Sequence, residues 1–117
     1  MRLSTKQQQF TVAIGKLIGY ASSKGYGLTF GDAMRDARLH GELGVKKGYG
    51  ARNSNHKVRL AVDFNLFVNG EYITSGTHPA YKDLGAKWKT LNELAEWGGE
   101  GKRNDANHFS FNHNGQW

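Results

Sequence analysis

The sequence predicts a small α+β protein in which an antiparallel sheet packs against two main helices. Two stretches carry apolar residues at helical spacing, and the segments between them resemble strands around an Asn-Gly turn. The chain has 117 residues, of which 38% are hydrophobic and 12% aromatic, so it is long enough for one modest core. We therefore expect a single domain over residues 1–117, without linker or repeat.

A first helix is predicted from Ser4 or Thr5, either of which can act as its N-cap, to about Ser22. Its apolar face is formed by residues that recur three or four positions apart: Phe10, Ala13, Ile14, Leu17, Ile18 and Ala21. Glycines after Ser22 end the element. We interpret this face as core rather than as a surface for a partner helix.

A second helix is predicted from Pro79 or Ala80 to about Trp97, since proline is favoured in the first helical turn. Its apolar face is formed by Tyr81, Leu84, Trp88, Leu91, Leu94 and Ala95. Asp83 is expected in the first turn, where the helix dipole favours a carboxylate. His78, just ahead of the helix, is expected to be exposed and not to bind a metal.

Two strands and a hairpin are predicted between the helices. The first strand covers residues 26–33, and the second covers residues 60–66, an apolar run around the carboxylate of Asp63. The Asn69-Gly70 pair is typical of a type I′ turn and predicts a hairpin over residues 67–73. This hairpin would hold the strand that carries Asp63 in a sheet.

Composition limits the classes of function. The chain contains no cysteine, which excludes disulfides, zinc ribbons and thiol nucleophiles. Sixteen Lys and Arg against ten Asp and Glu give a formal charge of +6, a balance that favours anionic partners such as nucleic acid or acidic cell-envelope polymers. No apolar run approaches the ~20 residues that span a membrane, and the first residues lack the apolar region of a signal peptide.

His56 and Asp63 form the first candidate pair of metal ligands. An aspartate inside an apolar strand is costly to bury unless a cation compensates its charge. Seven extended residues span up to roughly 23 Å, so His56 must lie in a loop that folds back towards the strand. An imidazole nitrogen beside a carboxylate oxygen suits zinc. On this segment alone, a surface histidine and a salt-bridged aspartate remain an equal alternative.

A second candidate group lies near the C-terminus, where Asp105 precedes His108 by three residues. A catalytic zinc keeps three protein ligands and one open position, and His56, Asp63 and His108 would supply the three. Asp105 would then accept a proton from water as a general base. An ordinary Asx-turn residue is the alternative for Asp105, and His113 is a competing candidate ligand.

With these residues in place, the sequence resembles the zinc D-Ala-D-Ala peptidase family. That family includes D-alanyl-D-alanine carboxypeptidases and phage endolysins that cut the L-alanyl-D-glutamate bond of peptidoglycan. The first signature of the family is S-x-H-x-x-G-x-A-x-D, and four residues fall on it: Ser54, His56, Ala61 and Asp63. Arg59 stands where this signature has glycine. Asp105 and His108 fall on the D-x-x-H element of the family, and Ser110 stands where several relatives carry an acid.

The resemblance implies a metallopeptidase fold of the LAS/hedgehog type, bound Zn²⁺ and a peptidoglycan stem peptide as substrate. It also implies that an arginine after the first strand contacts the substrate carboxylate or the oxyanion. Arg35 fits this role by position, and Arg38 is the second choice. A surface arginine paired with Asp32 or Asp36 is the plainer interpretation. Ser54 and Trp97 are candidate substrate contacts, and the Trp97-Gly98-Gly99 segment resembles the phage members.

The leading hypothesis is a monomeric zinc-dependent endolysin that hydrolyses the L-alanyl-D-glutamate bond and has no separate wall-binding domain. We expect synthesis in the host cytoplasm and access to the cell wall after the membrane is permeabilised. A D-alanyl-D-alanine carboxypeptidase is the first alternative. A basic metal-dependent nuclease leaves the His56/Asp63 pair without a role, and a non-catalytic binding module would need an exposed aromatic surface. No nucleic-acid partner is therefore expected.

Overall fold

The computed structural model describes residues 1–31, 58–101 and 103–117 of the chain. It contains two described helices and an antiparallel sheet, which confirms the predicted α+β class. The elements, in chain order, are α1 (Leu3–Ser23), β1 (Tyr26–Phe30), β2 (Ala61–Val68), β3 (Glu71–Tyr72), α3 (Pro79–Leu91), β4 (Ala95–Trp97) and β5 (His108–Phe111). None of the described helices is long and apolar enough to cross a membrane.

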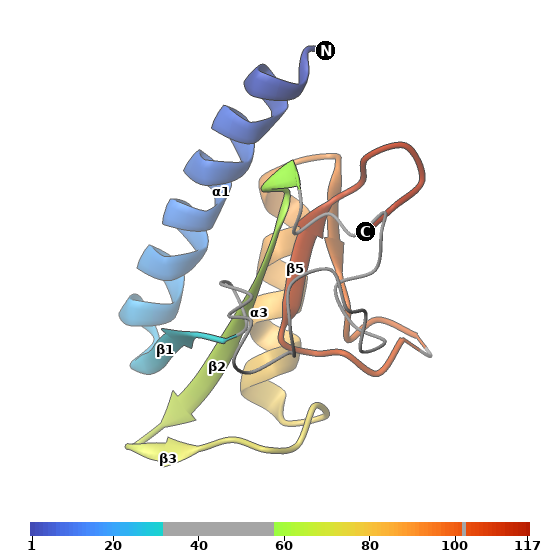
Figure 1. Ribbon diagram of the computed structural model, residues 1–117. Helices are drawn as coiled ribbons and strands as arrows, with labels where there is room; N and C mark the ends of the chain where they lie inside the picture. The colour runs from blue at the N-terminus through green and yellow to red at the C-terminus, as the bar shows by residue number, and fades with distance from the viewer. Residues whose placement is uncertain (32–57, 102) are drawn as a thin grey trace, which may run out of the picture.

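The sheet brings together strands that are far apart in the sequence (Figure 1). Its strand order is β1–β2–β5–β4, and β3 pairs with the end of β2. Each of these pairings is antiparallel. The β2–β5 pairing joins the middle of the chain to its C-terminal part and places Asp63 opposite His108.

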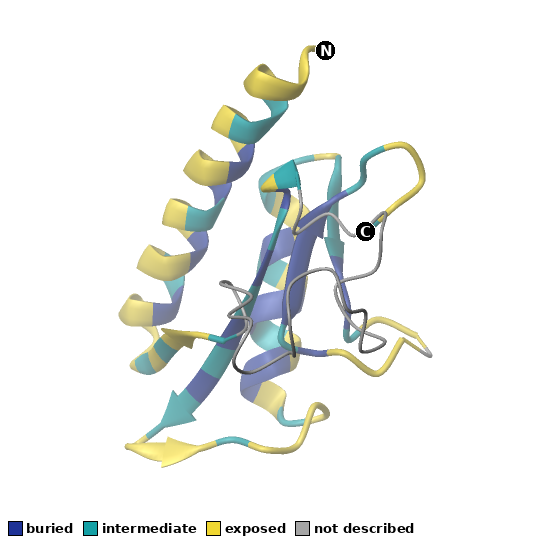
Figure 2. Ribbon diagram, in the orientation of Figure 1, coloured by how far each residue is buried: buried dark blue, intermediate teal, exposed yellow. Residues whose placement is uncertain are grey.

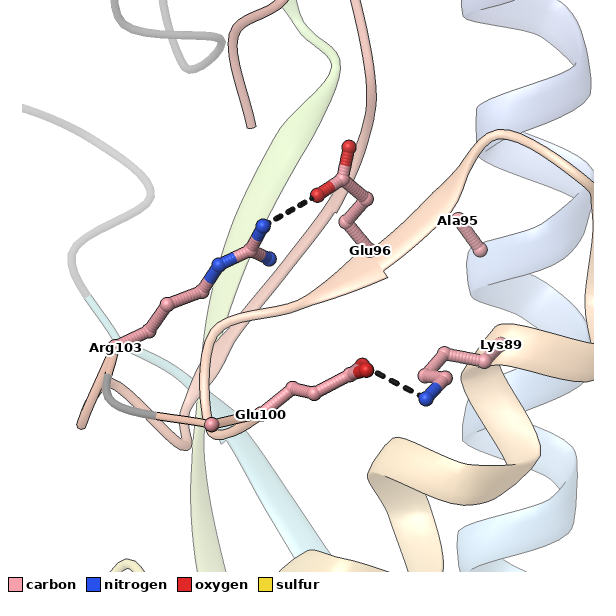
Figure 3. Close-up of a pocket in the computed structure, with 6 residues that line it drawn as sticks. Lys89, Ala95, Glu96, Glu100 and Arg103 are labelled. Atoms are coloured by element: carbon pink, nitrogen blue, oxygen red, sulfur yellow. Dashed lines mark hydrogen bonds and ion pairs between the residues drawn. The ribbon is translucent and has the colours of Figure 1, made fainter.

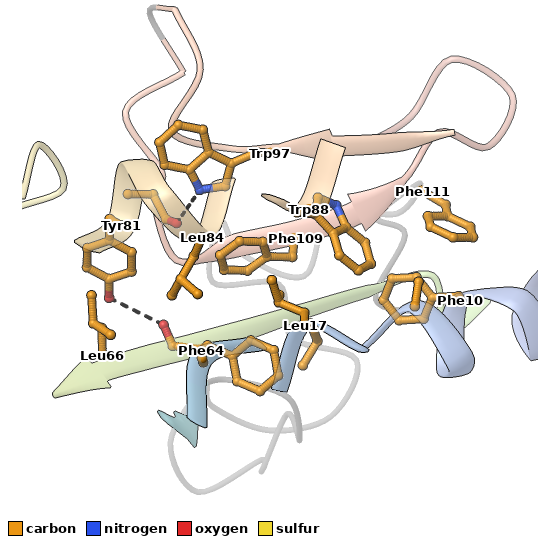
Figure 4. Packing of buried hydrophobic residues seen from close by; sticks show 14 of the residues in the cluster. Phe10, Leu17, Phe64, Leu66, Tyr81, Leu84, Trp88, Trp97, Phe109 and Phe111 are labelled. Carbon is orange, nitrogen blue, oxygen red and sulfur yellow. Dashed lines mark hydrogen bonds between the residues drawn. The ribbon is translucent and has the colours of Figure 1, made fainter. Parts of the chain in front are cut away.

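Both helices pack against the same face of the sheet. The ring of Phe111 on β5 lies 5.2 Å from that of Phe10 on α1 and 5.6 Å from that of Trp88 on α3, measured between ring centroids. Trp88 also packs edge-on against Phe109 at 6.1 Å. These rings form the centre of the core (Figure 4).

The inner face of α1 follows the predicted apolar pattern closely (Figure 2). Phe10, Ala13, Leu17 and Ala21 are buried, and Ile14 packs against the core from its edge. Ile18 departs from the prediction, because 40% of its surface is exposed. The apolar stripe therefore serves as core, as expected, but is narrower than its spacing suggests.

Polar atoms of α3 fix the helix to the strands beneath it. Trp88 Nε1 donates to the carbonyl oxygens of Glu96 and Ser110, both at 3.1 Å. Tyr81 donates through its hydroxyl to the carbonyl of Phe64 at 3.3 Å (Figure 4). Buried indole and phenol groups need such partners, and here the partners belong to three different strands. The helix is thus held in one position over the sheet.

The predicted second helix is too long. Helix α3 ends at Leu91, and the next residue, Asn92, is extended with φ −163° and ψ 147°. The Asn92 Oδ1 atom accepts a hydrogen bond from the backbone of Leu94 at 2.9 Å, which is a local alternative to helical bonding. Residues 95–97 then form β4 rather than a last helical turn.

The predicted helix starts are partly corrected. Helix α1 begins at Leu3 after Arg2, which makes no side-chain capping bond, so neither Ser4 nor Thr5 is the N-cap. Pro79 begins α3 as predicted. His78 is half-buried rather than exposed, because its Nδ1 caps α3 by accepting from the backbone of Ala80 at 3.0 Å.

The predicted Asn-Gly turn is confirmed. Asn69 and Gly70 have φ values of 54° and 78°, and Val68 pairs with Glu71 across them. Positive φ at both central residues defines a type I′ turn. The first strand begins at Tyr26 as predicted and ends at Phe30, and residues 32–33 of its predicted range lie outside the described residues.

Asp83 joins three elements on the far side of the core. It lies beyond the first turn of α3, in which no acidic residue stands, and accepts from Tyr20 of α1 at 2.5 Å and from Tyr26 of β1 at 2.7 Å. Partial burial alone would raise the Asp83 pKa, but the two phenol donors and nearby Lys24 outweigh it and lower the pKa below 3.8. The hydrogen bond to Asp83 in turn raises the pKa of Tyr26 to about 12.

Replacing Tyr26 by phenylalanine is expected to lower the free energy of unfolding at neutral pH by about 1 kcal/mol, because one partly exposed hydrogen bond is lost and the ring is kept. The raised pKa of Tyr26 means that its contribution is complete below pH 10.0 and is lost as pH rises towards 12. Urea denaturation across this range should therefore show a smaller alkaline loss in Tyr26→Phe than in the wild type.

Two further variants complete this test. Asp83 has a lowered pKa, so its contribution is present above pH 3.8 and is lost as pH falls below that value. Asp83→Asn should therefore lose less stability in acid than the wild type. Tyr72→Phe, at an exposed tyrosine of β3, is the control and should keep the alkaline loss. Equal alkaline losses in the wild type and in Tyr26→Phe would contradict the role given to Tyr26.

Candidate active site

Asp63 and His108 lie side by side on adjacent strands. They are register partners in the β2–β5 pairing, and Asp63 Oδ1 is 3.2 Å from His108 Nδ1. The Asp63 side chain is 15% exposed and that of His108 is 8% exposed. Two of the three predicted ligands, 45 residues apart in the sequence, therefore meet in the fold.

The alternation of side chains along the strands explains why these two residues share a face. Val62 and Phe109 are also register partners, and both are buried in the core beneath the helices. Residues next to them along the strands point to the opposite face. Asp63 and His108 are thus on the face of the sheet opposite to the described helices α1 and α3.

Gly31 leaves space beside Asp63 on its other side. Its backbone nitrogen donates to the carbonyl of Asp63 at 2.8 Å, which extends the β1–β2 contact past Phe30. A Cβ atom at position 31 would lie 3.2 Å from that of Asp63. The sequence signal for this residue was a glycine that interrupts an otherwise alternating strand, which can mark close approach to a site.

The D-x-x-H element forms a tight turn. The carbonyl of Asp105 accepts from the backbone nitrogen of His108 at 3.0 Å, and the Asp105 nitrogen donates to the carbonyl of Gly98 at 2.9 Å. Gly98 in turn donates to the His108 carbonyl at 2.8 Å. In this turn Asp105 is an exposed residue and His108 is buried.

Trp97 supports this turn from within the core. The indole is 8% exposed, and its Nε1 donates to the carbonyl of Ala106 at 2.6 Å (Figure 4). Its ring passes so close to Gly85 and Gly99 that a Cβ atom at either position would overlap it. The observed contacts of Trp97 are structural, and its predicted contact with substrate stays a prediction.

Arg59, which stands where the family signature has glycine, has a positive backbone φ. Its φ is 57°, in the left-handed region that side chains usually avoid. Glycine adopts this conformation without the steric cost that an arginine side chain brings. The cost is local strain, of the order of 1–2 kcal/mol for a non-glycine residue.

The last residues of the chain fold back towards the site. His113 and Gln116 form an antiparallel bridge, and Trp117 is half-buried with its ring centroid 5.1 Å from that of His108. His113 lies beside α1, with Nδ1 at 3.0 Å from Lys6 Nζ. The overlooked sequence signal is Asn114-Gly115, the same turn pair that predicted the hairpin at Asn69.

The donor pair fits a zinc ion. Two ligand atoms on a tetrahedral zinc are about 3.3 Å apart, given metal–ligand distances of about 2.0–2.2 Å. The observed separation of Asp63 Oδ1 and His108 Nδ1, 3.2 Å, matches that spacing. Within the described residues no group of three or more His, Cys, Asp or Glu side chains is placed to hold a metal. The third predicted ligand, His56, lies outside them.

Several other predicted site residues lie outside the described part of the chain. Ser54, Arg35 and its alternative Arg38 all fall within residues 32–57. Their proposed roles therefore stay predictions. Of the predicted catalytic residues, Asp105 is described, at the exposed start of its turn.

A paired aspartate and histidine on adjacent strands are groups that can hold a metal ion for hydrolytic chemistry. A sequence profile of the D-alanyl-D-alanine carboxypeptidase family matches residues 47–111, more than half of the chain. The chain belongs to this family. It is a metallopeptidase of the peptidoglycan-acting kind, and peptidases of this family are zinc-dependent in general. No curated protein matches the chain.

The matched range contains some of the predicted site residues and not others. Residues 47–111 include the three predicted metal ligands and Asp105, but they begin after Arg35. The family match therefore covers the positions of these predicted residues, and their roles stay predictions. The choice between Arg35 and Arg38 rests on the sequence alone.

Replacing Gly98 by alanine is expected to destabilise the protein by about 1–3 kcal/mol, the usual cost of forcing extra volume into a packed site. The new Cβ atom would overlap the carbonyl oxygen of Asp105 and lie 2.9 Å from Cβ of His108. Urea denaturation measures the loss, and competition with a chromophoric chelator measures whether zinc affinity falls as well.

Gly15→Ala is the matched control. Among the described residues, nothing lies within 4 Å of a Cβ atom at Gly15, which stands inside α1. Removing a glycine from a helix interior should stabilise the protein by about 0.5–1 kcal/mol and leave zinc binding unchanged. If Gly98→Ala were as stable and as tightly zinc-bound as the wild type, the turn would not depend on this close approach.

Proposed function

We propose that the protein is a zinc-dependent endopeptidase that hydrolyses the L-alanyl-D-glutamate bond of the peptidoglycan stem peptide, as phage endolysins do. The observation that carries this proposal is the pairing of Asp63 with His108 beside the Asp105 turn. The proposal assigns residues 1–117 to one catalytic unit that acts as a monomer. It also assigns synthesis to the host cytoplasm and action to the cell wall after the membrane is permeabilised.

Asp63 and His108 would hold the zinc ion together with His56. When bound, zinc supplies Lewis acidity and makes a nearby water more acidic. The antiparallel strands hold both described ligands on rigid backbone, which favours a fixed coordination geometry. The 15% exposure of the Asp63 side chain keeps its carboxylate accessible to the site.

Asp105 would serve as the general base and then as the general acid. An exposed carboxylate at a turn can accept the proton of the attacking water and pass it to the leaving amine. Asp105 precedes the proposed ligand His108 by three residues. The backbone hydrogen bond of 3.0 Å between them fixes the position of the Asp105 backbone relative to that of His108. Arg35 would bind the substrate carboxylate through its forked guanidinium group, with Ser54 as a further contact.

The charge of the protein supports an envelope substrate. A net charge of +6 favours approach to anionic cell-envelope polymers. The aromatic residues that a nucleic-acid binder would expose for base stacking are instead largely core, as Trp88, Phe64 and Phe109 are fully buried. This distribution argues against the nuclease and binding-module alternatives.

A D-alanyl-D-alanine carboxypeptidase is the second candidate function, and the family description itself supports it. The two activities share a metal site and a general base. They differ in the position of the scissile bond, and so in the product. The product therefore decides between them.

Asp63→Asn is expected to lower zinc affinity by more than about 100-fold, since the loss of an outer partner of a ligand already costs 10–100-fold. Competition with a chromophoric chelator measures the affinity, and circular dichroism checks the fold. Asp83→Asn is the matched control, since it neutralises a carboxylate that binds two tyrosines away from the site. Wild-type zinc affinity in Asp63→Asn would remove Asp63 from the metal site.

Asp105→Asn is expected to lower kcat by about 10²–10⁴-fold, the usual contribution of a general base, while zinc affinity stays unchanged. The assay is mass spectrometry of products from purified Gram-negative peptidoglycan, with wild type and chelated wild type in parallel. New amino-terminal D-glutamate supports the endopeptidase, and free D-alanine supports the carboxypeptidase. Glu100→Gln, at an exposed acid earlier in the same loop region, is the control and should cleave normally.

Failure is also informative in this assay. If the folded, zinc-loaded wild type released neither product, the peptidoglycan substrate would be excluded. If Asp105→Asn cleaved at the wild-type rate, the general base would have to be another group. Either result would leave the metal site in place and contradict the reaction proposed for it.

A further inference from the structure

The indole of Trp117 packs against the imidazole of His108. Their ring centroids are 5.1 Å apart and their planes are inclined at 83°, which is an edge-to-face arrangement. Such aromatic pairs contribute beyond the area that they bury. His108 is therefore bordered by Asp63 through Nδ1 and by Trp117 through the ring.

Arg103 holds Trp117 in this position. Its guanidinium carbon lies 4.2 Å from the centroid of the Trp117 ring, a stacked cation–π contact. The guanidinium is anchored in turn, since one nitrogen donates to Glu96 Oε1 at 2.8 Å and another to the carbonyl of Trp97 at 3.4 Å. Figure 3 shows the Arg103–Glu96 pair in a cleft of about 710 Å³.

Glu96 joins this contact to the strand that carries His108. Its second carboxylate oxygen accepts from Asn112 Nδ2 at 2.6 Å, so one side chain holds both Arg103 and the residue that follows β5. Glu96 is the register partner of Ser110, which places it on the same face of the sheet as His108. The side chains of Arg103 and Glu96, which hold Trp117 and are called the clamp below, are therefore anchored to the strands that carry the site.

A tight turn delivers Trp117 to the clamp. The backbone of Asn112 donates to Leu94 at 2.8 Å, and His113 and Gln116 exchange backbone bonds of 3.0 and 2.9 Å. The two residues between them, Asn114 and Gly115, have φ values of 52° and 81°, as a type I′ turn requires. Residues 112–117 are thus an ordered segment whose last side chain reaches the site.

We propose that Trp117 is a positioning residue for His108, held by Arg103 and Glu96. The indole fixes the orientation of the imidazole and shields it from water on one side, so that Nδ1 stays directed at Asp63. Groups that orient a metal-binding histidine set its affinity for the ion. The part of this inference that concerns zinc rests on the proposed function, whereas the orientation of His108 is a property of the protein without metal.

Two kinds of measurement test the proposal. In metal-free protein, the imidazole ring protons of His108 experience the ring current of Trp117, and their NMR shifts should move in Trp117→Ala. In zinc titrations against a chromophoric chelator, Trp117→Ala should bind about tenfold more weakly, in the range for outer partners of a ligand. Trp117→Phe, which keeps an aromatic ring, should restore most of the affinity.

Arg103 tests the same assembly through a second residue. Arg103→Ala should weaken zinc binding by a smaller factor, about threefold, and its effect should be largely lost when Trp117 is already alanine. Tyr72→Ala is the control for removing an aromatic side chain, since Tyr72 is 52% exposed on β3. If Trp117→Ala proves poorly folded, Trp117→Phe and Arg103→Ala carry the test.

The proposal is overturned if Trp117→Ala leaves both the His108 ring shifts and the zinc affinity unchanged. It is also overturned if the effects of Arg103→Ala and Trp117→Ala simply add, because Arg103 would then act independently of the indole. Failure of the wild type to bind zinc would contradict the proposed function instead. In that case the His108 shifts of the metal-free variants still decide whether Trp117 positions the ring.

Discussion

The antiparallel pairing of β2 with β5 is the interaction on which the rest of the structure depends. Its register places Val62 against Phe109 on the helix side and Asp63 against His108 on the other side. A shift of one residue would turn the two polar side chains towards the core and the apolar ones towards water. Packing of the core against α1 and α3 therefore selects the one register in which the candidate metal ligands meet.

Close backbone approach is the second constraint, and it explains how a small protein shapes a site. Trp97 fits between Gly85 of α3 and Gly99, and Gly98 fits against the turn from Asp105 to His108. The helix, the strand and the turn are thus packed as one unit around a single indole. A change in α3 near Gly85 would reach the acid and the histidine through Trp97, although α3 lies on the opposite face of the sheet.

Local sequence signals were sufficient for most of the fold. Helical spacing gave the inner face of α1, alternation gave β2, and Asn69-Gly70 gave the hairpin. Local spacing could not predict the end of α3, because Leu94 and Ala95 continue the helical pattern. The helix ends earlier because the Asn92 side chain bonds to the backbone of Leu94 and the residues that follow pair with β5. The position of Trp117 over His108 depends on contacts with Arg103 and Glu96 from other segments, so no local pattern contained it.

The Asp63–His108 pair gives a cysteine-free chain a possible cross-link. On the proposed function, one ion would tie together two strands whose residues stand 45 positions apart. In the loop-closure model, a covalent link that closes a loop of that length lowers the entropy of the unfolded chain, which stabilises the folded protein by about 4 kcal/mol at 25 °C. A bound ion would then stabilise the folded chain as well as supply its chemistry.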